Sequence, residues 1–198
     1  STALMIACYS GLHECAQALI EAGAAVDMVS NTGRTALMSA CERGHLECAQ
    51  ALIDANAAVD MVDNRGLTAL MYACLDGHHE CVQALIAAGA AVDTVSTVRC
   101  ETALMLACYW CNVECAQALI DAGADLELTD RDGWNALVFA AVSPTLDRII
   151  EEFEDEGGLN DEDDDELEER YVRRMQRKCE RRLEERRQGR AWCVQALL

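Results

Sequence analysis

A phrase of twenty residues that recurs along the chain is the feature that most constrains its fold. In its clearest copy it reads TALMSACERGHLECAQALID and starts at residue 35. Five copies, the last of them more divergent, begin at Thr2, Thr35, Thr68, Thr102 and Asn135, with spacings of 33, 33, 34 and 33 residues. A fixed period of this size predicts a solenoid, in which each small unit buries its apolar face only against its neighbours.

Each copy has the signals of two short helices followed by a turn-rich link. The leading Thr, or Asn135 in the fifth copy, is a good helix N-cap. In the second half of the unit, Cys48, Ala51, Leu52 and Ala55 follow the spacing of one helical face. Residues that accept a left-handed backbone then end the helices. We expect the first helix to end at Gly11, Gly44 and Gly77, and the second at Gly23, Asn56, Gly89 and Gly123.

These units resemble ankyrin repeats. The consensus Gly-x-Thr-Pro-Leu-His-x-Ala-Ala-x-x-Gly-His appears here as Gly33-x-Thr-Ala-Leu-Met-x-Ala-Cys-x-x-Gly-His45, and the resemblance covers about residues 1–156. It implies an all-α ankyrin-repeat solenoid of helix-turn-helix-loop units. Its core is predicted to include one Leu from each helix of the middle repeats, namely Leu37, Leu52, Leu70, Leu85, Leu104 and Leu119.

Four departures from the consensus stand out. Pro is replaced by Ala, and Met5, Met38, Met71 and Met105 replace the usual His, which predicts a flexible apolar filler where the family has a polar contact. The link before Thr102 has one extra residue and no turn Gly, and Cys111 stands where a helix-ending Gly is expected. Irregularity confined to repeat 4 indicates either a functional site or neutral drift.

The expected organisation has four parts. Residues 1–156 form the array, with repeats near 2–34, 35–67, 68–101, 102–134 and 135–156, the last a degenerate cap because its second helix carries charged residues. Residues 157–166 form an acidic linker, expected to be disordered. Residues 167–190 are expected to form a charged helix. Residues 191–198 are similar in sequence to a second helix of the array, which indicates the possible start of a further helical repeat. The first copy has no polar cap, so we expect the chain to be a fragment of a longer array.

The twelve cysteines favour an intracellular, reducing location, in the cytoplasm or nucleus. Eight are in register and are expected to be buried, where a thiol packs as a small hydrophobe: Cys8, Cys41, Cys74 and Cys108, and Cys15, Cys48, Cys81 and Cys115. Cys108, Cys111 and Cys115 have a metal-like spacing, but repeat 4 contains no His to complete a zinc site, and a redox CxxC normally sits near a βαβ pattern. We therefore expect no metal, no cofactor and reduced thiols.

Charge and motifs restrict the function further. Residues 1–150 carry 19 acidic and 6 basic side chains, so that segment should repel nucleic acid and anionic lipid heads. No phosphate-cradling Gly-rich loop, His-Glu-x-x-His pattern or nucleophile elbow is present, which argues against an enzyme. Residues 170–190 carry 10 basic and 3 acidic side chains. They form either a solvated helix or, less favoured, an arm that contacts an acidic protein or RNA.

The resemblance implies a non-enzymatic scaffold or adaptor that binds a protein partner through the groove lined by loop tips and first helices. Framework positions are nearly invariant between the copies, whereas positions expected in that groove differ, as they would on a specific surface or through drift. The candidate partner-binding residues are Tyr9, Arg34, Glu42, Arg43, Arg65, Leu67, Leu75, Asp76, Glu101, Tyr109, Trp110, Arg131, Asp132 and Trp134. The alternative is that the array is the targeting arm of a larger enzyme, such as a kinase or ubiquitin ligase.

Overall fold

The computed structural model describes residues 1–142 and 196–197. Within that part of the chain it is all-helical, with no β-strand. Its helices are α1 Ala3–Tyr9, α2 His13–Glu21, α3 Ala36–Glu42, α4 Leu46–Asp54, α5 Ala69–Asp76, α6 His79–Ala87, α7 Ala103–Tyr109, α8 Val113–Asp121 and α9 Ala136–Val142. The solenoid prediction is therefore confirmed. The predicted second helix of repeat 5, the acidic linker, the charged helix and nearly all of residues 191–198 lie outside the described residues.

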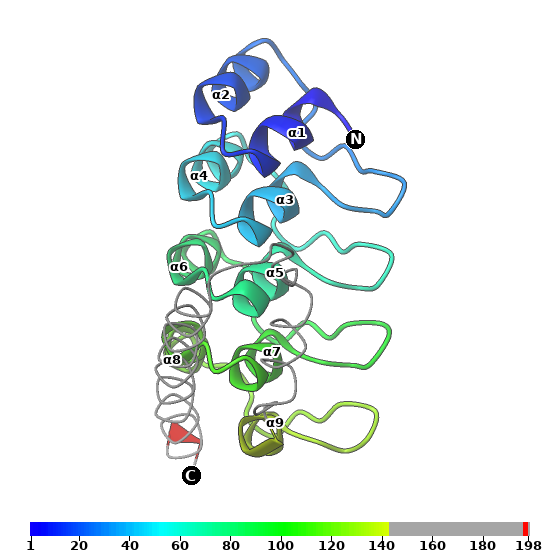
Figure 1. Ribbon diagram of the computed structural model, residues 1–198, viewed down its shortest axis with the longest axis vertical. Helices are drawn as coiled ribbons and strands as arrows, with labels where there is room; N and C mark the ends of the chain where they lie inside the picture. The colour runs from blue at the N-terminus through cyan, green and yellow to red at the C-terminus, as the bar shows by residue number, and fades with distance from the viewer. Residues whose placement is uncertain (143–195, 198) are drawn as a thin grey trace, which may run out of the picture.

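The helices form two parallel columns (Figure 1). The first helices of the repeats, α1, α3, α5, α7 and α9, stack in one column, and the second helices, α2, α4, α6 and α8, stack in the other. The links between repeats project as loops beside the first column. Each repeat thus packs on its sequence neighbours, which gives the elongated core that the period predicts.

The predicted caps are present. Thr2, Thr35, Thr68 and Thr102 each accept a hydrogen bond from the backbone N–H three residues later, at 3.2 Å. In repeat 5, the Asn135 side chain accepts from the Val138 N–H at the same distance. These bonds satisfy N–H groups that no helical carbonyl reaches.

The methionines that follow the caps are more than apolar filler. In three of the repeats the backbone N–H of the capping Thr donates to a Met sulfur at 3.4 Å, with Met5, Met38 and Met105 as acceptors. A thioether is a weak acceptor, so the sulfur completes a reciprocal capping box in which a polar side chain is usual. The expectation that a polar contact is lost at this position was therefore wrong in these repeats.

The turn between the two helices of a repeat is locked by the next repeat. Gly44 has a φ of +70°, and a Cβ built on it would lie 2.4 Å from the His78 ring. That ring in turn lies 3.2 Å from the Glu42 carbonyl oxygen. In repeat 4 the ring is replaced by Asn112, which donates to the carbonyls of Cys74 and Leu75 at 2.8 and 3.2 Å. Glycine is thus required here both for its backbone conformation and for the close approach.

Two non-glycine residues adopt the same left-handed conformation in the irregular repeat. Cys111 has a φ of +57° at the helix-ending position, and Cys100 has a φ of +60° in the longer link before Thr102. Asn56, the predicted substitute for a stop glycine in repeat 2, has a φ of +60°. The backbone therefore keeps its path in repeat 4 although two of its glycines are missing.

The core lies between the two columns and between successive repeats. All six predicted core leucines are at most 2% exposed. Seven of the eight in-register cysteines are buried, and their thiols interact between repeats, Cys8 with Cys48, Cys41 with Cys81, and Cys74 with Cys115. Burial, helped by the Cys48 thiol, raises the pKa of Cys8 to about 12.

Cys15 is the exception, because it is exposed. Its equivalents Cys48, Cys81 and Cys115 are covered by the first helix of the preceding repeat, whereas α2 belongs to the outermost repeat of the described stack. The prediction that both in-register positions are buried in every repeat was therefore wrong for Cys15.

Candidate functional site: the loop-side face

The projecting loops join into a continuous wall along the stack. The Asn64 N–H donates to the Thr32 carbonyl, the Thr97 N–H to the Arg65 carbonyl, and the Arg131 N–H to the Arg99 carbonyl, each at 3.0 Å. This wall and the adjoining C-terminal ends of the first helices form one surface, which we call the loop-side face. Its residues come from every described repeat, so a ligand lying along it would meet several loops at once.

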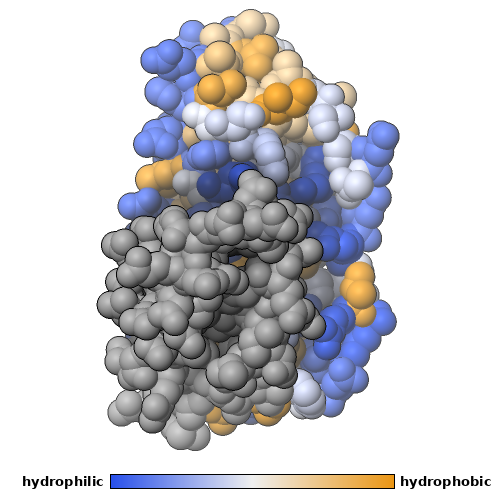
Figure 2. All heavy atoms as spheres, viewed as in Figure 1, coloured by the Kyte–Doolittle hydropathy of each residue, from blue (hydrophilic) through white to orange (hydrophobic). Residues whose placement is uncertain are grey.

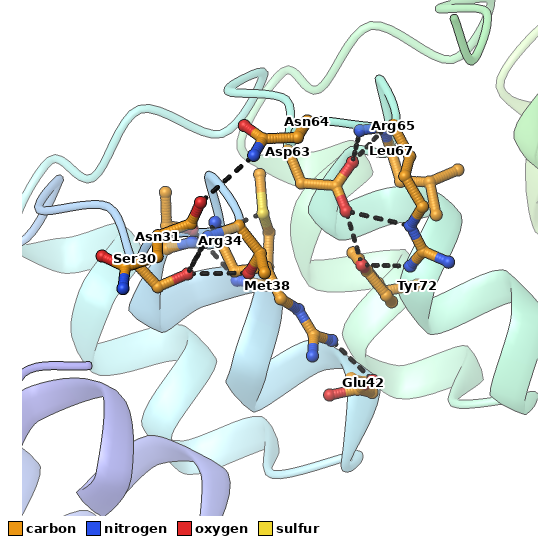
Figure 3. A network of polar contacts seen from close by, with 12 residues as sticks. Ser30, Asn31, Arg34, Met38, Glu42, Asp63, Asn64, Arg65, Leu67 and Tyr72 are labelled. Atoms are coloured by element: carbon orange, nitrogen blue, oxygen red, sulfur yellow. Dashed lines mark hydrogen bonds and ion pairs between the residues drawn. The ribbon is translucent and has the colours of Figure 1, made fainter. Parts of the chain in front are cut away.

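From here on, each link is counted with the repeat whose first helix it leads into, so Arg34 belongs to repeat 2 and Asp63 to repeat 3. A polar network joins the loops of repeats 2 and 3 to the first helices (Figure 3). In the part of this network that belongs to repeat 3, the central residue is Asp63. One carboxylate oxygen accepts from the backbone N–H groups of Arg65 and Leu67, at 2.8 and 2.9 Å. The other accepts from the Tyr72 hydroxyl at 2.8 Å and from the Arg65 side chain at 3.4 Å. Tyr72 also accepts a hydrogen bond from Arg65 at 2.7 Å, which closes a triangle of three side chains.

The environment of Asp63 keeps it ionised. Burial alone would raise the pKa of this carboxyl group, but the hydrogen bonds from Leu67, Tyr72 and Arg65, together with the Arg65 charge, lower it below its ordinary value. A buried carboxylate that accepts several N–H and O–H bonds is well satisfied. The loop of repeat 3 is therefore rigidly attached to helix α5.

Repeat 2 uses a different pairing. Arg34 forms an ion pair with Glu42 at 2.5 Å and lies over the Tyr72 ring, 4.5 Å from its centroid. Arg43, at the end of α3, stacks in the same way on Tyr9 of repeat 1, at 4.9 Å. Each cation–π contact is worth about 0.5–1 kcal/mol at exposed sites. Both contacts cross a repeat boundary, so they link neighbouring repeats on this face.

The other end of the face is aromatic. Tyr109 packs edge-on against Trp110 and Phe139, with ring centroids 5.3 and 6.0 Å apart, and Trp134 packs edge-on against Phe139 at 6.1 Å. Trp134 remains 39% exposed. The clustering of Tyr109, Trp110 and Trp134 is thus mediated by Phe139, which is buried and was not among the predicted site residues.

The structure corrects one predicted site residue. Leu67 occupies the position of Arg34, Glu101 and Trp134, but it is only 7% exposed and packs in the core. Its side chain therefore supports the fold and is not available to a partner. All thirteen of the other predicted residues are exposed or half-buried: Tyr9, Arg34, Glu42, Arg43, Arg65, Leu75, Asp76, Glu101, Tyr109, Trp110, Arg131, Asp132 and Trp134.

Two organising residues were missed by sequence reasoning, Tyr72 and Phe139. They occupy equivalent positions in α5 and α9, where repeat 2 has Ser39 and repeat 4 has Leu106. Variation at this otherwise apolar position was the available signal. Variation alone does not show that a buried aromatic ring at this position holds the loop above it.

A hollow of about 400 Å³ lies at the repeat 1 end of the face, lined by Met5, Ile6, Tyr9, Arg34 and other residues of the first two repeats. Ile6 is 58% exposed, whereas the equivalent Tyr72 is 3% exposed beneath its own loop. The upper end of the molecule in Figure 2, formed by repeat 1, has a largely apolar surface.

Charge is sorted between the two sides of the stack. All five arginines of residues 1–142 lie on loops or at the end of a first helix, and this segment contains no Lys. Twelve exposed acidic residues lie on the second helices or in the segments directly after them: Glu14, Glu21, Asp27, Glu47, Asp54, Asp60, Glu80, Asp93, Glu114, Asp121, Asp125 and Glu127. The side that carries the second helices is therefore strongly anionic, and the loop-side face is mixed.

Two kinds of site are not found in the described part of the chain. No group of three or more His, Cys, Asp or Glu side chains in residues 1–142 and 196–197 could hold a metal ion. Among the same residues, no helix is long and apolar enough to cross a bilayer.

The two-helix units, their caps and their projecting loops agree with a comparison to known protein families. The model described as ankyrin repeats (3 copies) matches residues 4–96, 55–130 and 92–152. The chain is an ankyrin-repeat protein. A search of curated proteins found no match. Ankyrin repeats are in general protein–protein interaction modules, so belonging to this family supports a protein-binding role without naming a partner.

Proposed function

We propose that this ankyrin-repeat protein is a non-enzymatic scaffold or adaptor that binds a protein partner through its loop-side face. One observation carries the proposal. Differences between the repeats concentrate on this face, while the stacking positions repeat the same residues. A single equivalent position at the end of the first helices holds Ser10, Arg43, Asp76 and Trp110 in successive repeats, all of them exposed or half-buried, whereas the core position of the second helices holds Leu52, Leu85 and Leu119.

The aromatic end of the face is the best candidate for the centre of binding. Trp and Tyr offer large contact area at low entropic cost and dominate interface hot spots. Trp134 is partly exposed, and its ring is held against Phe139. A pre-positioned aromatic side chain loses little freedom on binding, which favours affinity.

The test is affinity capture with matched variants of the 198-residue chain. Trp134→Ala and Trp110→Ala should each weaken binding of the captured partner by about 2 kcal/mol or more, with little change in melting temperature. The control is Glu47→Ala, an exposed change on helix α4 away from the loops, which should leave capture unchanged. A large drop in melting temperature with undiminished capture would assign the two tryptophans to the fold.

The location is proposed to be the cytoplasm or nucleus, because a stack with paired buried thiols suits a reducing compartment. The same face would serve a stand-alone scaffold or the targeting arm of a larger enzyme. The complete reading frame distinguishes these two arrangements.

A further inference from the structure

We propose that the loop tips of repeats 3 to 5 bind an acidic segment of the partner protein through the guanidinium groups of Arg65, Arg99 and Arg131. The inference rests on the proposed function and specifies the chemistry of the partner. It follows from how the charges of these three loops are oriented.

The loops carry both signs of charge, but most of the acids face inward. The Asp63 side chain is 3% exposed and Glu101 is 14% exposed, while Asp130 is also buried. Asp130 accepts from the N–H groups of Asp132 and Trp134 at 2.9 and 2.8 Å, as Asp63 does in its own loop. Carboxylates used in this way hold the loop backbone and are not presented to solvent.

The arginines face outward. The side chains of Arg65 and Arg99 are 61% and 59% exposed, and Arg131 is also exposed. The exposed acid among these three loops is Asp132. The three loops carry nearly equal numbers of acidic and basic side chains, but their tips expose mainly guanidinium groups. An approaching ligand meets these donors first.

Each guanidinium is partly fixed by a contact within the wall. Arg65 donates to the Tyr72 hydroxyl at 2.7 Å, Arg99 lies 3.5 Å from Glu101, and Arg131 donates to the Thr97 carbonyl at 2.7 Å. A guanidinium has five N–H donors in a planar fork, so these contacts leave donors for an incoming carboxylate. Fixing the side chain beforehand reduces the entropy lost on binding.

The irregular loop of repeat 4 adds an apolar contact at the same place. Its extra residue widens the turn: the Cys100 N–H donates to the Ser96 carbonyl four residues back at 3.0 Å, whereas the Gly66 N–H donates to the Asp63 carbonyl three residues back at 2.9 Å. The longer tip exposes Val98, at 54%, directly before Arg99. The fitting ligand is therefore an acidic protein segment that also carries an apolar side chain to pack on Val98.

Nucleic acid fits this surface less well. The twelve exposed acids on the second-helix side would repel a long phosphate backbone, whereas a short acidic segment needs to meet only the loop tips. Arginine binds carboxylates and phosphates alike in a bidentate geometry, so it is the repulsion by these acids that favours a short segment. The proposed occupant is therefore an acidic segment of a protein.

The experiment is a fluorescence-anisotropy titration of the full chain with labelled synthetic peptides. The probe alternates Glu and Ser around a central Leu, and its neutral twin has Gln in place of every Glu. We expect the chain to bind the acidic probe more tightly than its twin, with affinity falling as salt rises from about 0.05 to about 0.3 M. Residues 151–169 of the chain contain 13 acidic side chains that could compete. They compete equally with both peptides, so the comparison between the peptides is unaffected.

Variants locate the site. Arg99→Gln and Arg131→Gln should each weaken binding of the acidic probe by about two- to tenfold. The control Gln83→Glu, which changes the net charge by the same amount at an exposed position of helix α6, should not. Arg65→Gln also removes contacts to Tyr72 and Asp63, so its result is interpreted only beside a thermal melt.

Three results would overturn the inference: equal binding of the two peptides, unchanged affinity in both Arg99→Gln and Arg131→Gln, or tighter binding of a single-stranded oligo(dT) than of the acidic probe. In any of these cases the scaffold proposal is judged separately by the tryptophan variants. If those variants still weaken partner capture, only the assignment of an acidic partner segment has failed.

Discussion

The interface between stacked repeats and the loop-side face are built from the same repeating unit but follow different rules. In the stacking interface, the leucines of the second helices are identical in repeats 2 to 4 and fully buried, at 0% exposure. On the loop-side face, the position before each first helix changes from Arg34 to Leu67, Glu101 and Trp134. Each repeat therefore keeps the leucines on which stacking depends, whereas the position before the capping residue varies even where its side chain contacts the core, as Leu67 does, or the next repeat, as Arg34 does.

The two regions also differ in what happens when a hydrogen-bonding side chain is replaced in a later repeat. In the stacking interface, Asn112 replaces His78 and still bonds the carbonyls of the preceding repeat. On the loop-side face, Phe139 replaces Tyr72, and no group among the described residues donates to the Asp130 Oδ2 atom that corresponds to the one Tyr72 satisfies in Asp63. The replacing residue keeps the hydrogen bond to the preceding repeat in the stacking interface, whereas on the loop-side face the hydrogen bond to the loop aspartate is lost.

The largest expected effect comes from a charge placed in the stacking interface. Leu85→Asp should destabilise the array by more than about 4 kcal/mol and abolish its cooperative unfolding, because it buries an unpaired carboxylate between repeats. The measurement is thermal or denaturant unfolding followed by circular dichroism at the helical signal.

Gln83→Asp on the same helix is the control, since its side chain is exposed, and it should change stability by no more than about 0.5 kcal/mol. If Leu85→Asp unfolded as cooperatively as the unchanged chain, the stacking interface would not be the source of stability that we describe.

Substitutions at two glycines distinguish the cost of a left-handed backbone from the cost of a clash with the next repeat. Gly44 and Gly89 both have positive φ, but a Cβ would meet the His78 ring at Gly44 and nothing within 4 Å at Gly89. Gly89→Ala should cost about 1–2 kcal/mol for the left-handed backbone alone. Gly44→Ala should cost more, because the ring must also move.

Denaturant unfolding of both variants measures the difference. Adding His78→Ala to Gly44→Ala should recover part of the loss if the ring is the cause. Equal costs at the two glycines would show that the approach of the next repeat does not constrain the turn.

Two opposite substitutions test the hydrogen bond between an aromatic hydroxyl and the loop aspartate, which is present in repeat 3 and missing in repeat 5. Tyr72→Phe removes the hydroxyl that Asp63 and Arg65 share and should destabilise the array by about 1 kcal/mol. Phe139→Tyr supplies a hydroxyl near Asp130 and should stabilise it by a similar amount. Opposite signs in urea unfolding are the expected result, and two changes of the same sign would contradict the equivalence of the two loops.

The smallest effect is one of reactivity. Cys15 is exposed and should be alkylated rapidly in the native chain, whereas Cys74 should react only on unfolding. Burial, with the hydrogen bond to Cys115 adding to it, raises the pKa of Cys74 well above its ordinary value, so almost no thiolate is present at neutral pH. Mass spectrometry of alkylated peptides with and without denaturant gives both rates. Rapid native labelling of Cys74 would show that the repeats separate readily.

Much of the fold could be predicted because each signal is local. Thr35 caps its helix through an N–H three residues away, and Gly44 and Asn56 end helices by their own backbone conformation. The candidate site was predicted less well. Its position followed from variation between copies, but variation does not separate an exposed side chain such as Trp134 from a buried one such as Leu67.

By itself, the sequence determined the period, the two helices of each unit, their caps and ends, and the leucines of the core, because these depend on residues within one turn or one repeat. The tertiary structure alone decided that Cys15 is exposed, that Tyr72 joins Asp63 and Arg65, and that the loop acids turn inward while Arg99 and Arg131 turn outward. These properties depend on which groups of neighbouring loops and helices lie within bonding distance. A net charge of −19 therefore did not predict the charge presented by one face.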